Sequence, residues 1–87
     1  MPRYYKNLSE TVTADNENFR LNSNGIDVQN TGTTAAFFDS IYIAPGTGRK
    51  FPHEIEGEIC IYEKDIVITF EDGTGELIVN QFTYSRK

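Results

Sequence analysis

The residues most able to act as a nucleophile and a base are the only cysteine, Cys60, and the only histidine, His53. They lie seven positions apart in a stretch whose alternating pattern predicts one strand, so they would point to opposite faces about 23 Å apart. None of the four serines has the neighbouring signature of an activated nucleophile; they are Ser9, Ser23, Ser40 and Ser85. We therefore expect a protein that is not an enzyme and has no catalytic residues.

Metal-binding chemistry could reside in the acidic residues of the second half. Glu54, Glu56 and Glu58 alternate along one predicted strand, which would place their side chains on one face about 6–7 Å apart. Such a face could hold a hard cation such as calcium, although a neighbouring loop would have to add oxygen ligands. A strand guarded by charge is the favoured interpretation. The acidic run 71–76 lacks the ligand spacing of an EF-hand and indicates a hairpin turn, so we expect no metal and no cofactor.

The run Gly46-Thr47-Gly48-Arg49-Lys50 superficially has the composition of a phosphate-binding loop. It lacks the spacing of the P-loop motif, and no helix follows to direct its N-terminus at a phosphate. With two glycines and two prolines between residues 45 and 52, this stretch is predicted to be the longest loop. Its basic residues could still contact an acidic partner.

Size and charge limit the classes of function. The chain has 87 residues, a net charge of −5 and one cysteine, which predicts a single domain over 1–87 without an internal disulfide. The acidic balance argues against a nucleic-acid partner. No stretch approaches the roughly 20 apolar residues of a membrane span, and the start lacks the apolar segment of a secretory signal. We expect synthesis and folding in a cytoplasm and no membrane partner.

The elements that would position any site are short strands. Around the stretch 26–46, apolar and polar residues alternate from Ile26 to Gln29, a turn covers 30–33, and apolar runs cover 35–38 and 41–43 before Pro45-Gly46. Further strands are predicted over 10–14, 19–21, 53–62, 66–71 and 77–84, with hairpin turns at 22–25 and 72–75. Residues 1–8 could form an N-terminal arm. About seven or eight short strands without a helix predict an all-β fold, a small antiparallel β-sandwich or a jelly-roll-like barrel.

Aromatic residues are numerous for a chain without tryptophan. The adjacent pairs Tyr4-Tyr5 and Phe37-Phe38 cannot both point inward from a strand with one buried face. One member of each pair must then lie in a two-sided core or in an interface, where aromatic residues are enriched. A domain of this size is also marginally stable alone, so we expect contacts with other chains.

The segments Val28–Thr34 and Ile41–Gly46 resemble small immunoglobulin-like β-sandwich domains of tailed-bacteriophage structural proteins, which carry an N-T-G-T turn, a strand and a P-G turn. The longer, basic stretch 47–52 departs from that pattern. The resemblance implies a virion component that decorates a capsid, joins head to tail or belongs to a fibre. It implies contacts with other copies and other virion proteins, and no catalytic residues. We expect its interface at Arg3, Tyr4, Tyr5, Arg49, Lys50 and Arg86.

Two other functions are compatible with the sequence. A carbohydrate- or receptor-binding module would expose Tyr42, Tyr62 or Phe38 on a concave sheet face beside Asn or Asp. A small regulator or inhibitor of a host protein would need no recognisable site.

Overall fold

The computed structural model describes the backbone of residues 3–51, 54–55, 58–59 and 62–86, and the side chains of residues 7–51 and 62–83. Within these residues the chain is all-β and contains no helix. The described residues form ten strands: β1 Arg3–Ala14, β2 Asn16–Ser23, β3 Gly25–Asn30, β4 Ala36–Phe38, β5 Ile41–Ile43, β6 Gly48–Phe51, β7 Glu54–Ile55, β8 Glu58–Ile59, β9 Tyr62–Phe70 and β10 Thr74–Arg86.

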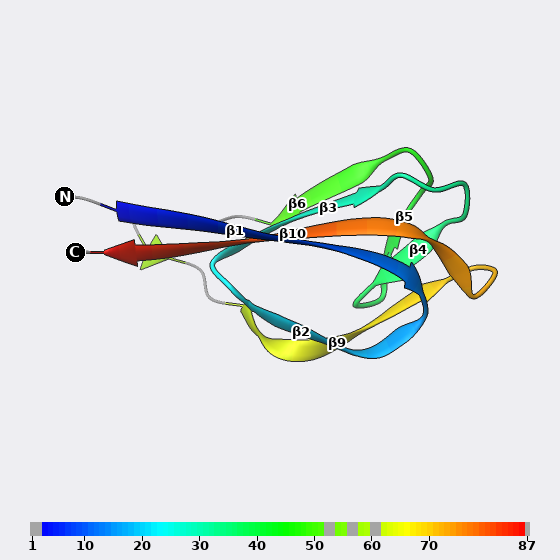
Figure 1. Ribbon diagram of the computed structural model, residues 1–87, viewed down its shortest axis with the longest axis horizontal. Helices are drawn as coiled ribbons and strands as arrows, with labels where there is room; N and C mark the ends of the chain where they lie inside the picture. The colour runs from blue at the N-terminus through cyan, green and yellow to red at the C-terminus, as the bar shows by residue number, and fades with distance from the viewer. Residues whose placement is uncertain (1–2, 52–53, 56–57, 60–61, 87) are drawn as a thin grey trace.

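Eight of these strands form two antiparallel sheets of four strands that pack face to face (Figure 1). One sheet, called sheet A here, has the order β1-β10-β3-β6, and the other, sheet B, has the order β2-β9-β4-β5. The remaining strands of the described residues, β7 and β8, form a separate two-stranded sheet. The prediction of a small antiparallel β-sandwich is confirmed. The eight strands of the two sheets match the expected seven or eight, although β1 and β10, with 12 and 13 residues, are longer than the short strands that were expected.

Most connections cross from one sheet to the other. The chain passes from β1 to β2, from β2 to β3, from β3 to β4 and from β9 to β10 with a change of sheet each time. The predicted hairpins at 22–25 and 72–75 are therefore wrong, although the chain does turn at both places. Turn residues fix where the backbone reverses, but not whether the flanking strands bond to each other. In contrast, β4 and β5 stay in sheet B and form a hairpin through Asp39 and Ser40, both at positive φ.

The core follows the period of two that the sequence displays. In β3, Ile26 and Val28 are buried, while Asp27 and Gln29, which alternate with them, are not. In β9, Ile66, Ile68 and Phe70 point inward, since alternate residues of a strand face opposite sides. Burial of this apolar surface is the main favourable term in folding.

A buried glutamine ties the two sheets together. Gln81 of β10 accepts a hydrogen bond from the Asn22 backbone N–H at 2.9 Å and donates one to the Arg20 carbonyl at 3.3 Å. Both partners lie on β2 of sheet B, so one side chain of sheet A satisfies backbone groups of the opposite sheet. The Asn24 N–H adds a bond of 2.8 Å to the Phe82 carbonyl.

Two predictions between residues 47 and 62 are wrong. The expected loop 47–52 contains β6, whose residues pair with β3 from Gln29↔Gly48 to Ile26↔Phe51. The expected single strand 53–62 is divided, because β7 and β8 pair antiparallel with Glu54 opposite Ile59. Glu54 and Glu58 thus belong to different strands, which removes the basis for a row of three glutamates. Glu56, His53 and Cys60 lie outside the described residues.

Candidate interaction surfaces

The outer edge of β1 is the longest free strand edge of the sandwich. β1 pairs with β10 on one side, and within the described residues no strand pairs with its other side. The other edge strands are shorter: β2 has eight residues, β6 four and β5 three. An unpaired edge presents N–H and C=O groups that can bond to another chain, so β1 is the principal candidate for adding a strand from a partner.

An apolar side chain stands exposed on this edge strand. Leu8 is 60% exposed, and its neighbours Asn7, Ser9, Glu10 and Thr11 are exposed as well. Val12, on the same face of β1 as Leu8, is buried in the core. The core therefore covers this face of β1 at Val12 but not at Leu8, which is left as an exposed apolar side chain on an edge strand. The sequence prediction missed Leu8, whose only signal is its place as a lone apolar residue among polar neighbours.

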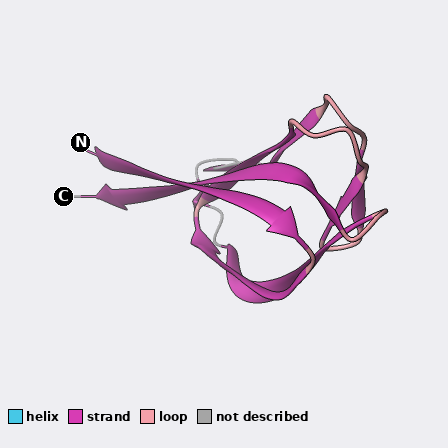
Figure 2. Cartoon of the chain, turned by 45° about the vertical axis from the view of Figure 1, so that its right-hand side comes forward, coloured by secondary structure: helices cyan, strands magenta, loops and turns pink. Residues whose placement is uncertain are grey.

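The first and last strands continue beyond the sandwich as a two-stranded arm (Figures 1 and 2). β3 pairs with β10 from Leu77 to Phe82, so among the described strands the residues from Arg3↔Arg86 to Lys6↔Thr83 pair with each other alone. The predicted interface residues Arg3, Tyr4 and Tyr5 thus share this arm with Arg86. Arg3 is directly opposite Arg86 in the backbone register, so the last described pair of the arm consists of two arginines.

The other predicted contact residues, Arg49 and Lys50, lie elsewhere. Both are exposed on β6, the opposite edge strand of sheet A from β1. β10 and β3 separate the two edges, so Arg49 and Lys50 are about 14 Å from β1 at ordinary strand spacing. The structure therefore divides the six predicted interface residues into two sites, one on the arm and one on β6.

The outer face of sheet B carries a second exposed apolar surface. Tyr42 is 56% exposed and Val67 is 48% exposed. The Phe37 ring packs edge-to-face against Tyr42, with ring centroids 5.5 Å apart. Phe38 points into the core, so one member of the Phe37-Phe38 pair faces inward and the other outward, as the alternation requires. Tyr62 packs against the core and Phe38 is buried, so of the three candidate sugar-binding aromatics Tyr42 alone is well exposed.

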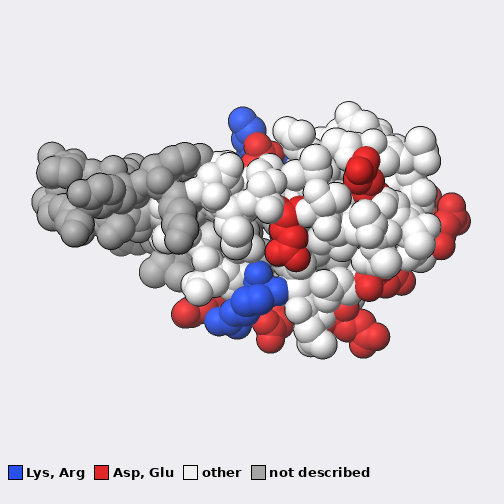
Figure 3. Space-filling model, in the orientation of Figure 1, with Lys and Arg blue, Asp and Glu red and all other residues white. Residues whose placement is uncertain are grey.

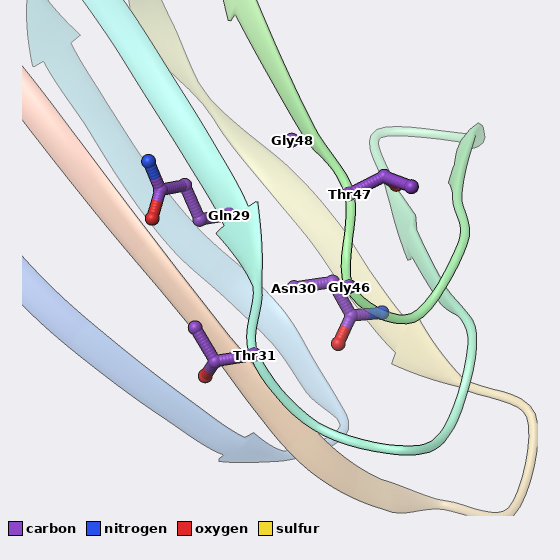
Figure 4. Close-up of a pocket in the computed structure, with 6 residues that line it drawn as sticks. All are labelled: Gln29, Asn30, Thr31, Gly46, Thr47 and Gly48. Atoms are coloured by element: carbon purple, nitrogen blue, oxygen red, sulfur yellow. The ribbon is translucent and has the colours of Figure 1, made fainter.

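A pocket of about 330 Å³ lies where β3 ends beside the turn into β6 (Figure 4). Asn30 beside it is 1% exposed. Its amide nitrogen donates to the Thr34 carbonyl at 2.8 Å and the Ile43 carbonyl at 3.1 Å, and its amide oxygen accepts from the Gly32 N–H at 3.0 Å. Both amide N–H groups and one acceptor position of the oxygen are thus used within the chain, where they join β3 to the following turn and to β5.

The same pocket offers little to an anion. The Gly46 N–H donates to the Asn30 carbonyl at 2.8 Å, and the Thr47 N–H donates to the Ala44 carbonyl at 3.2 Å. Phosphate loops bind through backbone N–H groups that point at the ligand, whereas these two point at their own chain. These two N–H groups are therefore already used in hydrogen bonds within the chain.

A smaller apolar pocket of about 230 Å³ opens at the other end of the core. Phe38, Phe51 and Tyr62 line it, and successive ring centroids are 5.7 and 6.2 Å apart. Lys64 and Asp39 stand at its rim and form an ion pair of 2.9 Å. Phe51 and Tyr62 flank the segment that carries β7 and β8, so their contact closes the base of that segment against the core.

On the face drawn in Figure 3, the charged side chains that the structure describes are distributed over several separate areas. Figure 3 shows acidic groups along the sandwich and basic groups in two small areas of this face. The ion pairs Lys64–Asp39 and Arg20–Asp65, the latter at 3.6 Å, are largely exposed, and such pairs contribute only about 0–1 kcal/mol each. Within the part of the chain that the structure describes, no three His, Cys, Asp or Glu residues are arranged to hold a metal ion.

Comparisons with known proteins were made at three levels. No model of a protein family, no characterised protein and no solved structure matches this chain. Among the described residues, no helix has the length and apolar character to cross a membrane.

Proposed function

We propose that the protein is a non-enzymatic structural component of a tailed-bacteriophage particle, made in the host cytoplasm and acting through protein–protein contacts. Its partners are other copies of itself and other virion proteins, with roles such as capsid decoration, head–tail joining or part of a fibre. The observation that carries the proposal is the free edge of β1, 12 residues long, with Leu8 exposed upon it. The resemblance of Val28–Thr34 and Ile41–Gly46 to phage sandwich domains is the reason for proposing that the assembly is a phage particle.

Three features support an assembly role. Monomeric proteins usually blunt their edge strands, but β1 is the longest edge here and extends into a projecting arm (Figure 2). A strand edge supplies main-chain hydrogen bonds to any extended segment, and neighbouring side chains supply the specificity. The arm also brings Arg3 opposite Arg86, which would favour an acidic surface on the partner.

Genomic surroundings give the first test. Capsid, portal or tail genes beside this gene support the proposal, and surroundings without any virion gene contradict it. The second test is co-sedimentation of the purified protein with capsids and tails of the phage so identified. Wild type should sediment with one of them, and Leu8→Asp should not, because a charge on the edge strand opposes pairing.

Val67→Asp is the matched control. It introduces the same charge at an exposed apolar position on the outer face of sheet B, away from β1. This variant should co-sediment like wild type, and circular dichroism should show that both variants keep the strand content. Wild type that sediments with neither capsids nor tails at micromolar concentration would contradict the proposed role.

A carbohydrate-binding module is the second candidate, favoured by Tyr42. This side chain presents an exposed ring and a hydroxyl on the outer face of sheet B, supported by Phe37, and such a side chain combines apolar contact with hydrogen bonding. A glycan array tests this function. Binding that is lost in Tyr42→Ala and kept in Leu8→Asp supports it, and an array without any signal for wild type contradicts it.

A further inference from the structure

We infer that two copies of this protein pair β1 to β1 in antiparallel orientation, with the two-fold axis at Leu8. This inference rests on the proposed function and names the partner of the β1 edge as a second copy of the chain. The pairing would join the two copies into one continuous sheet, β6-β3-β10-β1 of one copy followed by the same strands of its partner in reverse order. Such an isologous interface is the commonest form of homodimer.

Symmetry restricts the registers that this pairing can use. Successive residues of a strand direct their backbone N–H and C=O groups alternately to one side and the other, so identical antiparallel strands must place a residue opposite its own counterpart. The two-fold axis therefore passes through a residue and not between residues. Each register along β1 can then be judged by which side chains it places opposite one another.

One register matches opposite charges. With the axis at Leu8, Lys6 lies opposite Glu10 of the second copy, twice per dimer, and the exposed leucines meet at the centre. An axis at Lys6 or at Glu10 would place like charges opposite each other. An axis at Asn7 would leave Lys6 opposite Leu8, and one at Ser9 would place Leu8 opposite Glu10. The sequence of β1 is thus self-complementary about Leu8.

The structure leaves this edge accessible. Asn7, Leu8, Ser9, Glu10 and Thr11 are all exposed, and the strand continues into the arm beyond the body of the sandwich (Figure 2). Contact between the leucines would remove from water an apolar side chain that is 60% exposed in one copy. A small domain buries a lower fraction of its surface on folding than a large one, so additional burial in a dimer adds relatively more to its stability.

Charge exchange across the axis tests the register. The oligomeric state of the full chain is measured by sedimentation equilibrium over a wide range of concentration. Wild type should be a dimer, and Lys6→Glu and Glu10→Lys should each weaken it by roughly tenfold or more, since each places like charges opposite one another twice. The double variant K6E/E10K should dimerise like wild type. An equimolar mixture of the two single variants should form the mixed dimer in preference to either homodimer, as native mass spectrometry would show.

Glu17→Lys is the matched control. It makes the same change of charge at an exposed position of β2 and should leave the dimer unchanged. A wild type that stays monomeric at every concentration, or a dimer indifferent to both single charge changes, would overturn the inference. A monomer that still binds capsids or tails through a Leu8-dependent contact would overturn the second copy as partner and leave the proposed function standing. A charge-sensitive dimer that binds no virion component would contradict the proposed function and support the second copy as the partner of β1.

Discussion

Replacing Asn30 by alanine should remove about a third of the stability of this domain. The change eliminates three hydrogen bonds, to the Thr34 carbonyl, the Ile43 carbonyl and the Gly32 N–H, from a side chain that is 1% exposed. At about 1 kcal/mol net for each bond, the loss is about 3 kcal/mol. A chain of 87 residues is expected to have about 4–13 kcal/mol in all. The melting temperature should fall by about 12–24 °C.

Urea denaturation followed by circular dichroism measures this loss as a lower midpoint at unchanged slope. Asn30→Asp is the matched control, because it keeps the shape and the acceptor but lacks the amide donor. It should be at least as destabilising as Asn30→Ala at pH 7, since it sets a carboxylate beside two carbonyl oxygens. Burial raises the pKa of such a carboxyl in the folded state above its unfolded value of about 3.9. The difference in free energy of unfolding between wild type and Asn30→Asp should therefore be small below pH 4 and should grow as the pH rises through the pKa of the folded state.

A loss below 1 kcal/mol for Asn30→Ala would refute this reasoning. It would mean that the backbone bonds of the same residue, which join Asn30 to Thr47 and Gly46 at 2.8 Å each, hold the loops by themselves. Equal stability of Asn30→Asp and wild type at pH 7 would show that the amide donors contribute nothing.

Four further substitutions test local features, each through its urea midpoint. Gly75→Ala should lower the free energy of unfolding by about 1–3 kcal/mol through overpacking, since a Cβ there would lie next to the ring of buried Phe70. Gly73→Ala, in open space at φ 80°, should lower it by about 1 kcal/mol from backbone strain alone. Ser40→Gly should gain about 0.5–1 kcal/mol, because Ser40 holds φ 70° in the β4–β5 turn, where glycine is preferred, and a loss would contradict this. Ser23→Ala should gain about 1 kcal/mol by removing a buried hydroxyl that has no hydrogen-bond partner among the described residues, and a lower urea midpoint would contradict this.

Local features of the fold could be predicted from the sequence. Alternation from Ile26 to Gln29 gave the strand and its buried face, because a period of two is a direct consequence of strand geometry. Asn30-Thr31-Gly32 and Pro45-Gly46 marked real turns, since their side chains or conformational freedom favour reversal. The adjacent Phe37 and Phe38 divided between the two faces as expected.

The assignment of strands to sheets could not be predicted in the same way. Asn24-Gly25 has the composition of a tight hairpin, yet β2 and β3 diverge into different sheets and Gly25 is buried. That outcome depends on partners distant in the chain, such as β10 for β3 and β9 for β2. Likewise β6 forms in spite of its glycine because β3 offers it a free edge, which no local pattern records.

The candidate surfaces divide along the same line. Charge and aromatic content pointed to Arg3, Tyr4, Tyr5 and Arg86, and the register of β1 with β10 brings these positions together. No local pattern indicates how far Arg49 and Lys50 lie from the termini. The strand order places them on β6, at the opposite edge of sheet A from β1. Leu8 became recognisable only when its strand proved to be an edge, because exposure is a property of the assembled sheet.

The pairing of the first strand with the last has a consequence for how the chain reaches its native state. β1 cannot acquire its partner until β10 has been made, at the far end of the sequence, and closing so large a loop is entropically costly and slow. Until then β1 lacks its native partner strand, and an unpaired strand of an incomplete chain is prone to associate with other chains. Crowding of newly made copies, or a chaperone that shields this segment, would thus decide how much of the protein folds correctly.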